Sequence, residues 1–277
     1  MTQLGVFARS FPAGPPATVA RAIAQAGFEC AQLNLSAIGR PTLDADLDPE
    51  VARDIRADFD RFGVDVWGVS GTFNMAHPDA QRRRREQTAC EGLIARASAL
   101  GARAVTLCSG TRDASDMWRA HPDNATPAAW GDMRTSLDGL LAAAADGGVM
   151  LGIEPESGNV VRDAAAASRL LHELGDDAQY VTIVLDPANL LSVETLADQE
   201  DIVSRAFDTL GAHVGCVHAK DVVADGSYSA PGAGGMDYQL VMRLHAGLPQ
   251  DVPVIAQDLT ANDAPRVAAF LRAAAAA

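Results

Sequence analysis

Four polar side chains that can bind metals or carry protons each follow a short apolar run in the second half of the chain. The residue directly before each polar one is apolar, as in Ile153-Glu154 and Val217-His218. If the apolar runs are strands, side chains alternate between two faces, so the four polar side chains point to one side. The four residues are Glu154, Asp186, His218 and Gln257.

Two carboxylates, an imidazole and an amide oxygen in one place need a partner, because an unpaired buried charge costs several kcal/mol. Three oxygen donors and one nitrogen suit Mn²⁺, Mg²⁺ or Co²⁺ better than a sulfur-rich zinc site does, although Zn²⁺ also accepts such ligands. We therefore predict one divalent metal ion, Mn²⁺ first, held by Glu154, Asp186, His218 and Gln257. The alternative is four separate structural residues, each hydrogen-bonded locally.

The elements that must position these residues follow one repeating pattern. An apolar run rich in Val, Leu and Ile is followed by polar or Gly/Pro residues and then by a helical stretch, as at 16–28, 79–100 and 127–147. Glycines such as Gly148 stand where a helix would end before the next strand. Nearly continuous apolar strands that alternate with helices are typical of a parallel sheet covered by helices. The eight runs begin at Leu4, Cys30, Val64, Ala104, Val149, Tyr180, His213 and Val252.

The length of 277 residues would allow about two domains, but a closed α/β barrel reaches about 250 residues as one. Eight strand–helix units without a change in composition favour a single (β/α)8 TIM barrel over residues 1–277, with its active site at the carboxyl ends of the strands. The alternative is an open, doubly wound sheet.

Charge and composition exclude several classes of function. The formal net charge of −14 repels phosphate backbones and anionic lipids, so we expect no nucleic-acid or membrane partner. No uncharged apolar stretch approaches the ~20 residues of a membrane span, and the first residues lack the pattern of a secretory signal. We predict a soluble, cytoplasmic protein whose scattered cysteines are reduced thiols. The cysteines are Cys30, Cys90, Cys108 and Cys216.

Several motifs resemble those of the xylose isomerase-like barrels, specifically the sugar phosphate isomerase/epimerase group. The likeness covers nearly the whole chain and implies metal ligands at Glu154, Asp186 and His218, with Gln257 in the fourth place. The motifs are IEPE at 153–156, LDPAN at 185–189, VHAKD at 217–221 and VIAQDL at 254–259, with weaker support from GTFNMAHPD at 71–79 and GAGGMDY at 232–238.

The chain departs from the keto-sugar epimerases of that group in its proton-transfer residues. Gln257 stands where those enzymes have a second glutamate, and an amide cannot accept a proton in that role. Asn189, Ala224 and Val160 stand where they have a histidine, an arginine and a glutamate. The departures weaken the case for a two-carboxylate epimerase mechanism and add weight to a lyase.

Other residues are candidates to move protons. Glu156 and Lys220 share the inward face with Glu154 and His218, one layer nearer the mouth of the barrel. We predict Glu156 as a base, while Lys220 would neutralise an oxyanion or act as an acid. The alternative is a salt bridge between the two at the rim. His77 would bind a substrate hydroxyl or act as an acid, or else cap the helix that follows it.

Two long connections, 110–126 and 220–235, lie on the face where barrel enzymes have their sites. In the first, Arg112 and Asp113 are predicted to contact substrate hydroxyls or phosphate, and Trp118 to form a wall of a lid. Asn189 is a further predicted substrate-binding residue. The glycine-rich part of 220–235 would either wrap a phosphate or serve as a hinge.

The predicted function is a metal-dependent isomerase or epimerase that acts on a sugar, keto-sugar or polyol-like substrate through an enediolate. One alternative is a metal-dependent lyase or dehydratase of a keto-sugar or keto-inositol, for which one base suffices. Another is a non-catalytic sugar-binding barrel. A homodimer is the expected assembly, as in many barrels of this group.

Overall fold

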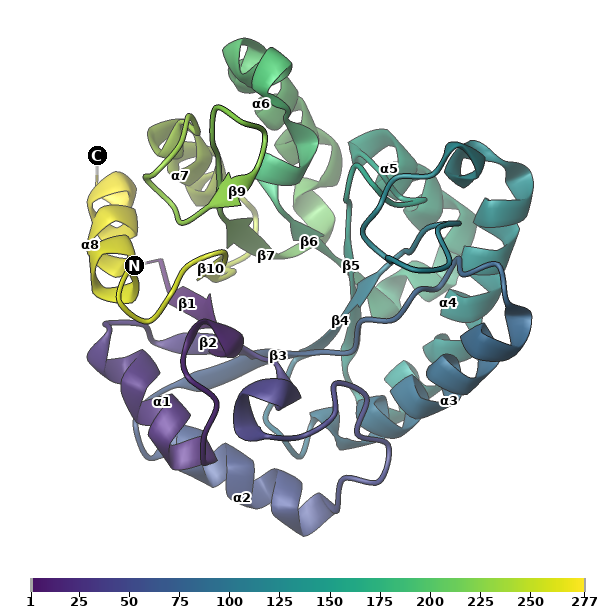
Figure 1. The fold of residues 1–277 in the computed structure, drawn as a ribbon, viewed down its shortest axis with the longest axis horizontal. Helices are drawn as coiled ribbons and strands as arrows, with labels where there is room; N and C mark the ends of the chain where they lie inside the picture. The colour runs from purple at the N-terminus through teal and green to yellow at the C-terminus, as the bar shows by residue number, and fades with distance from the viewer. Residues whose placement is uncertain (1, 277) are drawn as a thin grey trace.

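Eight parallel strands close into a barrel in the computed structural model, which describes residues 2–276. Around the barrel the strand order is β1-β10-β7-β6-β5-β4-β3-β2, and helices surround it (Figure 1). The predicted (β/α)8 barrel is confirmed, and the open sheet is wrong. The strands are β1 (Leu4–Phe7), β2 (Cys30–Leu33), β3 (Asp65–Ser70), β4 (Ala104–Cys108), β5 (Met150–Glu154), β6 (Val181–Leu185), β7 (Val214–Ala219) and β10 (Val254–Ala256). A separate hairpin consists of β8 (Asp221–Val222) and β9 (Tyr228–Ser229).

The helices begin and end at residues of the expected kinds. Asp79 accepts hydrogen bonds from the first backbone N–H groups of α3, and Gly148 ends α4 with a φ of 63°. The helices are α1 (Pro16–Gln25), α2 (Pro49–Asp60), α3 (Ala80–Ala97), α4 (Pro127–Gly147), α5 (Ala164–Leu174), α6 (Gln199–Leu210), α7 (Tyr238–Ala246) and α8 (Ala264–Ala275). Short 3₁₀ helices lie at Ala8–Ser10, Leu35–Ile38, Pro122–Ala125, Gly175–Tyr180, Pro187–Leu190, Val193–Asp198 and Gly211–His213.

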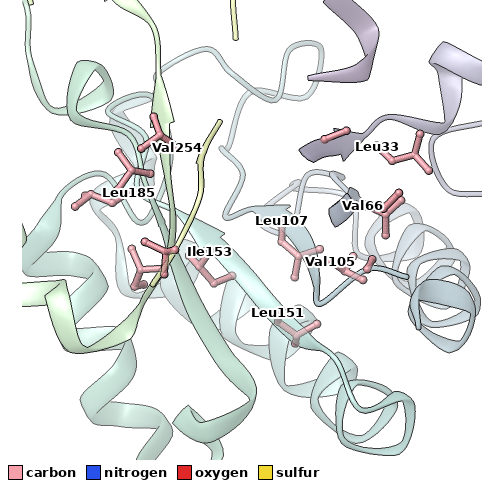
Figure 2. Close-up of a cluster of buried hydrophobic side chains, with 14 of the residues drawn as sticks. Leu33, Val66, Val105, Leu107, Leu151, Ile153, Leu185 and Val254 are labelled. Carbon is pink, nitrogen blue, oxygen red and sulfur yellow. The ribbon is translucent and has the colours of Figure 1, made fainter. Parts of the chain in front are cut away.

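Side chains alternate along the barrel strands as predicted. The residues before the four polar ones are buried in the large core that the strands form with the helices, and Figure 2 shows Ile153 and Leu185 among them. A second, smaller cluster fills the inside of the barrel and includes Val184, Cys216 and Ile255. The inward positions beyond this cluster, at the carboxyl ends of the strands, are therefore left to polar side chains.

Strand β10 is shorter than the run that predicts it, which changes where Asp258 points. Strand alternation would turn Asp258 away from the barrel mouth, but β10 ends at Ala256. Asp258 has a φ of 55°, a left-handed conformation that is uncommon outside glycine and that aspartate tolerates. Its side chain lines the cavity at the barrel mouth. Asp258 thus lines the mouth because the strand ends before the alternation reaches it.

All four cysteines are buried and free, in agreement with the prediction of reduced thiols. Among residues 2–276, no helix has the length and apolar character that a membrane crossing requires.

Replacement of Leu107 by alanine tests the core between strands and helices. Leu107 is fully buried on β4, so the Leu107→Ala variant leaves a cavity and lowers the free energy of unfolding by about 2–5 kcal/mol in urea titrations. The control is Val193→Ala at an exposed position, for which we expect a change below about 0.5 kcal/mol. Equal losses in both variants would contradict the assignment of Leu107 to this core.

Candidate metal centre and cavity

A cavity of about 320 Å³ opens at the carboxyl ends of the barrel strands. Its size is at the lower end of small-molecule sites. The lining is mostly polar and comes from both halves of the chain. The lining residues are Phe7, Arg9, Gln32, Asn34, Ser70, Thr72, Thr106, Trp118, Glu154, Glu156, Lys220, Tyr228, Gln257 and Asp258.

Three of the four predicted metal ligands meet at this end of the barrel. One ligand atom each from Glu154, Asp186 and His218 lies within 4.8 Å of the others. Glu154 ends β5, Asp186 follows β6 and His218 lies on β7, so three neighbouring strands supply the group. Asp186 and His218 are buried, with exposed fractions of 1% and 0%.

Gln32 fixes which nitrogen of His218 carries the proton. The Gln32 side-chain Nε2 donates to the hydroxyl oxygens of Ser70 and Thr106, both at 3.0 Å. Its Oε1 therefore faces His218 Nε2 at 2.9 Å and accepts a hydrogen bond from the N–H of that nitrogen. His218 Nδ1 is left facing Glu154 Oε1 at 3.2 Å. Metal-binding histidines have this arrangement, in which the second ring nitrogen donates to an oxygen.

Gln32 is not among the predicted site residues, although the sequence carries a signal for it. Polar Gln32 and Asn34 alternate with apolar Ala31 and Leu33 along the second strand, the pattern that singled out the four predicted ligands.

Two amides position the two carboxylates. Asn189 Nδ2 donates to Glu154 Oε1 at 2.9 Å, and Gln257 Nε2 donates to Asp186 Oδ2 at 2.7 Å. Asn189 is fully buried and does not line the cavity, so the structure places this predicted substrate contact behind Glu154. Gln257 does line the cavity.

Lys220 pairs with Asp186 and not with Glu156. Its Nζ lies 3.3 Å from Asp186 Oδ2 and 3.7 Å from the centre of the Tyr228 ring. Burial alone would lower the pKa of Lys220, but the carboxylates of Asp186, Glu154 and Glu156 outweigh it and raise the pKa above its ordinary value. Lys220 therefore keeps its positive charge. Among the ion pairs of residues 2–276 there is none between Lys220 and Glu156, so the alternative of a salt bridge at the rim is not observed.

The carboxyls of the site differ in their environments. Burial would raise the pKa of Glu154. When His218 carries a proton on Nδ1 as well as on Nε2, its charge and that of Lys220 hold this pKa below its ordinary value. Burial and the neighbouring Glu154 charge raise the pKa of Asp186, against the effect of Lys220. Burial raises the pKa of Glu156 to about 8.

The donor set fits a divalent cation. The carboxylates of partly buried Glu154 and buried Asp186 lie close together and repel each other, and burial together with the Glu154 charge raises the pKa of Asp186. A divalent cation would relieve that repulsion, and His218 Nδ1 offers a lone pair toward the same place. Oxygen donors with one imidazole are a set that Mn²⁺, Mg²⁺, Co²⁺ and Zn²⁺ accept.

Two predicted site residues, His77 and Arg112, are not among those that line the cavity. His77 Nδ1 accepts from the backbone N–H of Asp79, and the cap of α3 is Asp79 and not His77. Arg112 forms a 2.7 Å ion pair with Asp132 on α4. Both therefore hold loops and helices together around the site.

Asp113 and Trp118 lie on the same connection, 110–126, but in different surroundings. The Asp113 carboxylate accepts two hydrogen bonds from Ser115, which hold its pKa well below its ordinary value. Asp113 does not line the cavity, whereas Trp118 does and is 47% exposed. Trp118 is thus placed where the predicted wall of a lid would be.

The glycine-rich part of 220–235 surrounds a carboxylate of the chain itself. Buried Asp221 accepts hydrogen bonds from the backbone N–H groups of Gly232 and Met236, both at 2.9 Å. A Cβ at Gly234 would lie 2.5 Å from Asp221 Oδ1, so glycine is required there. These N–H groups are therefore not free to wrap a phosphate.

Comparisons with known proteins place the chain among similar barrels. A family model described as "Xylose isomerase-like TIM barrel" matches residues 20–248. No curated protein sequence matches the chain.

Solved structures resemble the chain over its whole length. The 3-keto-D-glucoside 4-epimerase YcjR of E. coli is 17% identical with a TM-score of 0.77, covering 99% of this chain and 100% of that one. D-Psicose 3-epimerase of Clostridium cellulolyticum H10, solved with D-tagatose, is 15% identical with a TM-score of 0.75, and 99% of each chain is covered. A xylose isomerase domain protein of Alicyclobacillus acidocaldarius is 16% identical with a TM-score of 0.70, covering 100% of this chain and 99% of that one. At these identities the likeness establishes the fold.

Loss of the Asp221 carboxylate should loosen the connection that carries the glycines. In Asp221→Ala, the N–H groups of Gly232 and Met236 lose a charged acceptor, so their hydrogen exchange accelerates at least about tenfold and the free energy of unfolding falls by about 2–3 kcal/mol. Asp225→Ala is the control, because Asp225 accepts only from Ser227 within its own exposed turn. Unchanged exchange at Gly232 and Met236 would refute this role of Asp221.

Proposed function

Because the chain belongs to the xylose isomerase-like TIM barrel family, we propose that it is a divalent-metal-dependent isomerase or epimerase of a sugar, keto-sugar or polyol-like substrate. The observation that carries the proposal is the group formed by Glu154, Asp186 and His218, in which Gln32 directs His218 Nδ1 toward the two carboxylates. Several of the similar solved structures, the 3-keto-D-glucoside 4-epimerase and D-psicose 3-epimerase among them, are named as sugar epimerases, which agrees with a small sugar as substrate.

Glu154, Asp186 and His218 would hold the ion, with the Gln257 amide oxygen as a fourth ligand. Gln257 donates its Nε2–H to Asp186, and a turn of the amide would present its oxygen instead. Mn²⁺ is our first choice of metal. The bound ion would act as a Lewis acid that polarises a substrate carbonyl and so acidifies the neighbouring C–H group.

Glu156 is the proposed base for that C–H group. It lines the cavity two residues beyond Glu154 and makes no ion pair among residues 2–276. Lys220 also lines the cavity and keeps its charge, so its role is to stabilise negative charge on a substrate oxygen. Trp118 and Tyr228 would stack on the apolar C–H faces of the sugar.

Gln257 favours a second candidate, a lyase or dehydratase of a keto-sugar or keto-inositol. An epimerase must return a proton to the opposite face of the carbon, and the Gln257 amide cannot carry it. β-Elimination needs one base for the α-proton, which Glu156 would supply. The two candidates differ in product mass, because elimination removes a water molecule from the substrate and epimerisation conserves its mass.

Elemental analysis tests the metal site directly. We expect about one divalent ion per chain after purification with Mn²⁺ or Co²⁺, and almost none in Glu154→Ala or His218→Ala, because each loses a ligand. Asp225→Asn, which removes an exposed carboxylate outside the cavity, should keep its metal. Metal-free wild-type protein would contradict the metalloenzyme and favour the non-catalytic sugar-binding barrel.

Hydrogen exchange of keto-sugars in D₂O tests the proton transfer. Wild-type protein should exchange the C–H next to the ketone of a substrate, and Glu156→Gln should slow this exchange about 10²- to 10⁴-fold without loss of metal. Mass spectrometry of the product separates isomerisation, which adds deuterium, from elimination, which also removes water. Equal exchange rates in wild type and Glu156→Gln would exclude Glu156 as the base.

A further inference from the structure

Arg9 is a cation of the cavity for which the structure gives no carboxylate partner within 4.0 Å among residues 2–276. It lies in the 3₁₀ helix that follows β1, and its side chain is exposed. Its guanidinium carbon lies 5.0 Å from the centre of the Phe7 ring, which supports the side chain from below. The other cation that lines the cavity is Lys220, whose charge is already paired with Asp186.

Arg9 stands across the barrel from the proposed base. Strands β1 and β5 are four strands apart in either direction around the closed sheet, so Arg9 and Glu156 belong to opposite sides of the mouth. Phe7 connects Arg9 to the metal side, because its ring makes an edge-to-face contact with His218 at 5.0 Å between centroids. A single aromatic ring therefore separates the guanidinium from the candidate metal ligands.

This placement would orient a substrate. A sugar whose carbonyl end lies at Glu154 and Glu156 and that spans the mouth would bring its far end to Arg9. A guanidinium offers paired N–H donors that match the oxygens of a carboxylate or a phosphate, and an unpaired charge at this position favours an anion over a neutral hydroxymethyl group.

We propose that Arg9 binds a terminal anionic group, carboxylate or phosphate, at the end of the substrate opposite the reacting carbons. This inference rests on the proposed function, because it takes the sugar to be oriented by the metal site and Glu156. It makes the preferred substrate an acidic sugar, either a keto-uronate or a keto-sugar phosphate.

Calorimetric titration with matched ligands tests the proposal. The probes are D-fructose and D-tagatose, the corresponding uronates, which replace the terminal hydroxymethyl group by a carboxylate, and the corresponding 6-phosphates. They are titrated into Mn²⁺-loaded wild type, Arg9→Gln and Arg21→Gln. Arg21 is exposed on α1, outside the cavity lining, so its replacement changes the net charge equally and serves as the control.

We expect wild type and Arg21→Gln to bind one class of anionic probe at least about tenfold more tightly than the neutral ketose. Arg9→Gln should lose that preference and keep the affinity for the neutral ketose within about twofold. The class of anionic probe that binds more tightly than the neutral ketose, uronate or 6-phosphate, shows whether the bound group is a carboxylate or a phosphate.

Three results would overturn the proposal. Equal affinities for neutral and anionic probes in wild type refute the anionic substrate and leave the sugar isomerase or epimerase intact. An anionic preference that persists in Arg9→Gln refutes the assignment to Arg9. If no ketose of either kind binds, the proposed function fails together with the inference.

Discussion

Repulsion between the carboxylates of partly buried Glu154 and buried Asp186 is the interaction to which the rest of the site responds. Isolated charges of one sign cannot be buried side by side without compensation. Asn189 donates to the first carboxylate, and Gln257 and Lys220 contact the second. Burial and the Glu154 charge nevertheless raise the pKa of Asp186, so these donors offset only part of the cost of its negative charge. What compensates the remainder in our proposal is a divalent cation, which draws on the same oxygens.

The position of Lys220 in turn depends on contacts made by the connection that follows β7 and by α7. The backbone carbonyl of Lys220 accepts a hydrogen bond from the buried Tyr238 hydroxyl of α7, at 2.8 Å. The next residue, Asp221, binds the backbone N–H groups of the glycine-rich segment, and Tyr228 of the hairpin β8–β9 lies against the Lys220 ammonium. The 220–235 connection is therefore built to hold one ammonium group beside Asp186.

The sequence predicts those parts of the site that follow from the alternation of side chains along a regular strand. Eight apolar runs predict the barrel, and alternation places Glu154, His218 and Gln257 on its inner face, because both follow from a regular backbone. Alternation does not predict the position of Asp258, because β10 ends after Ala256 and the chain then turns. It does not predict the position of Tyr228 either, because a hairpin inside a long connection brings Tyr228 to the cavity.

The two walls of the cavity differ in kind, and the difference separates reaction from recognition. Strands β5, β6 and β7 carry the titratable groups, whereas β2, β3 and β4 contribute neutral amides and hydroxyls that Gln32 links into one buried network. Because Gln32 also fixes the His218 tautomer, a hydrogen bond between Gln32 and His218 links the neutral wall to the metal side. In the proposed enzyme the charged wall sets the type of reaction, while the neutral wall and Arg9 select the substrate.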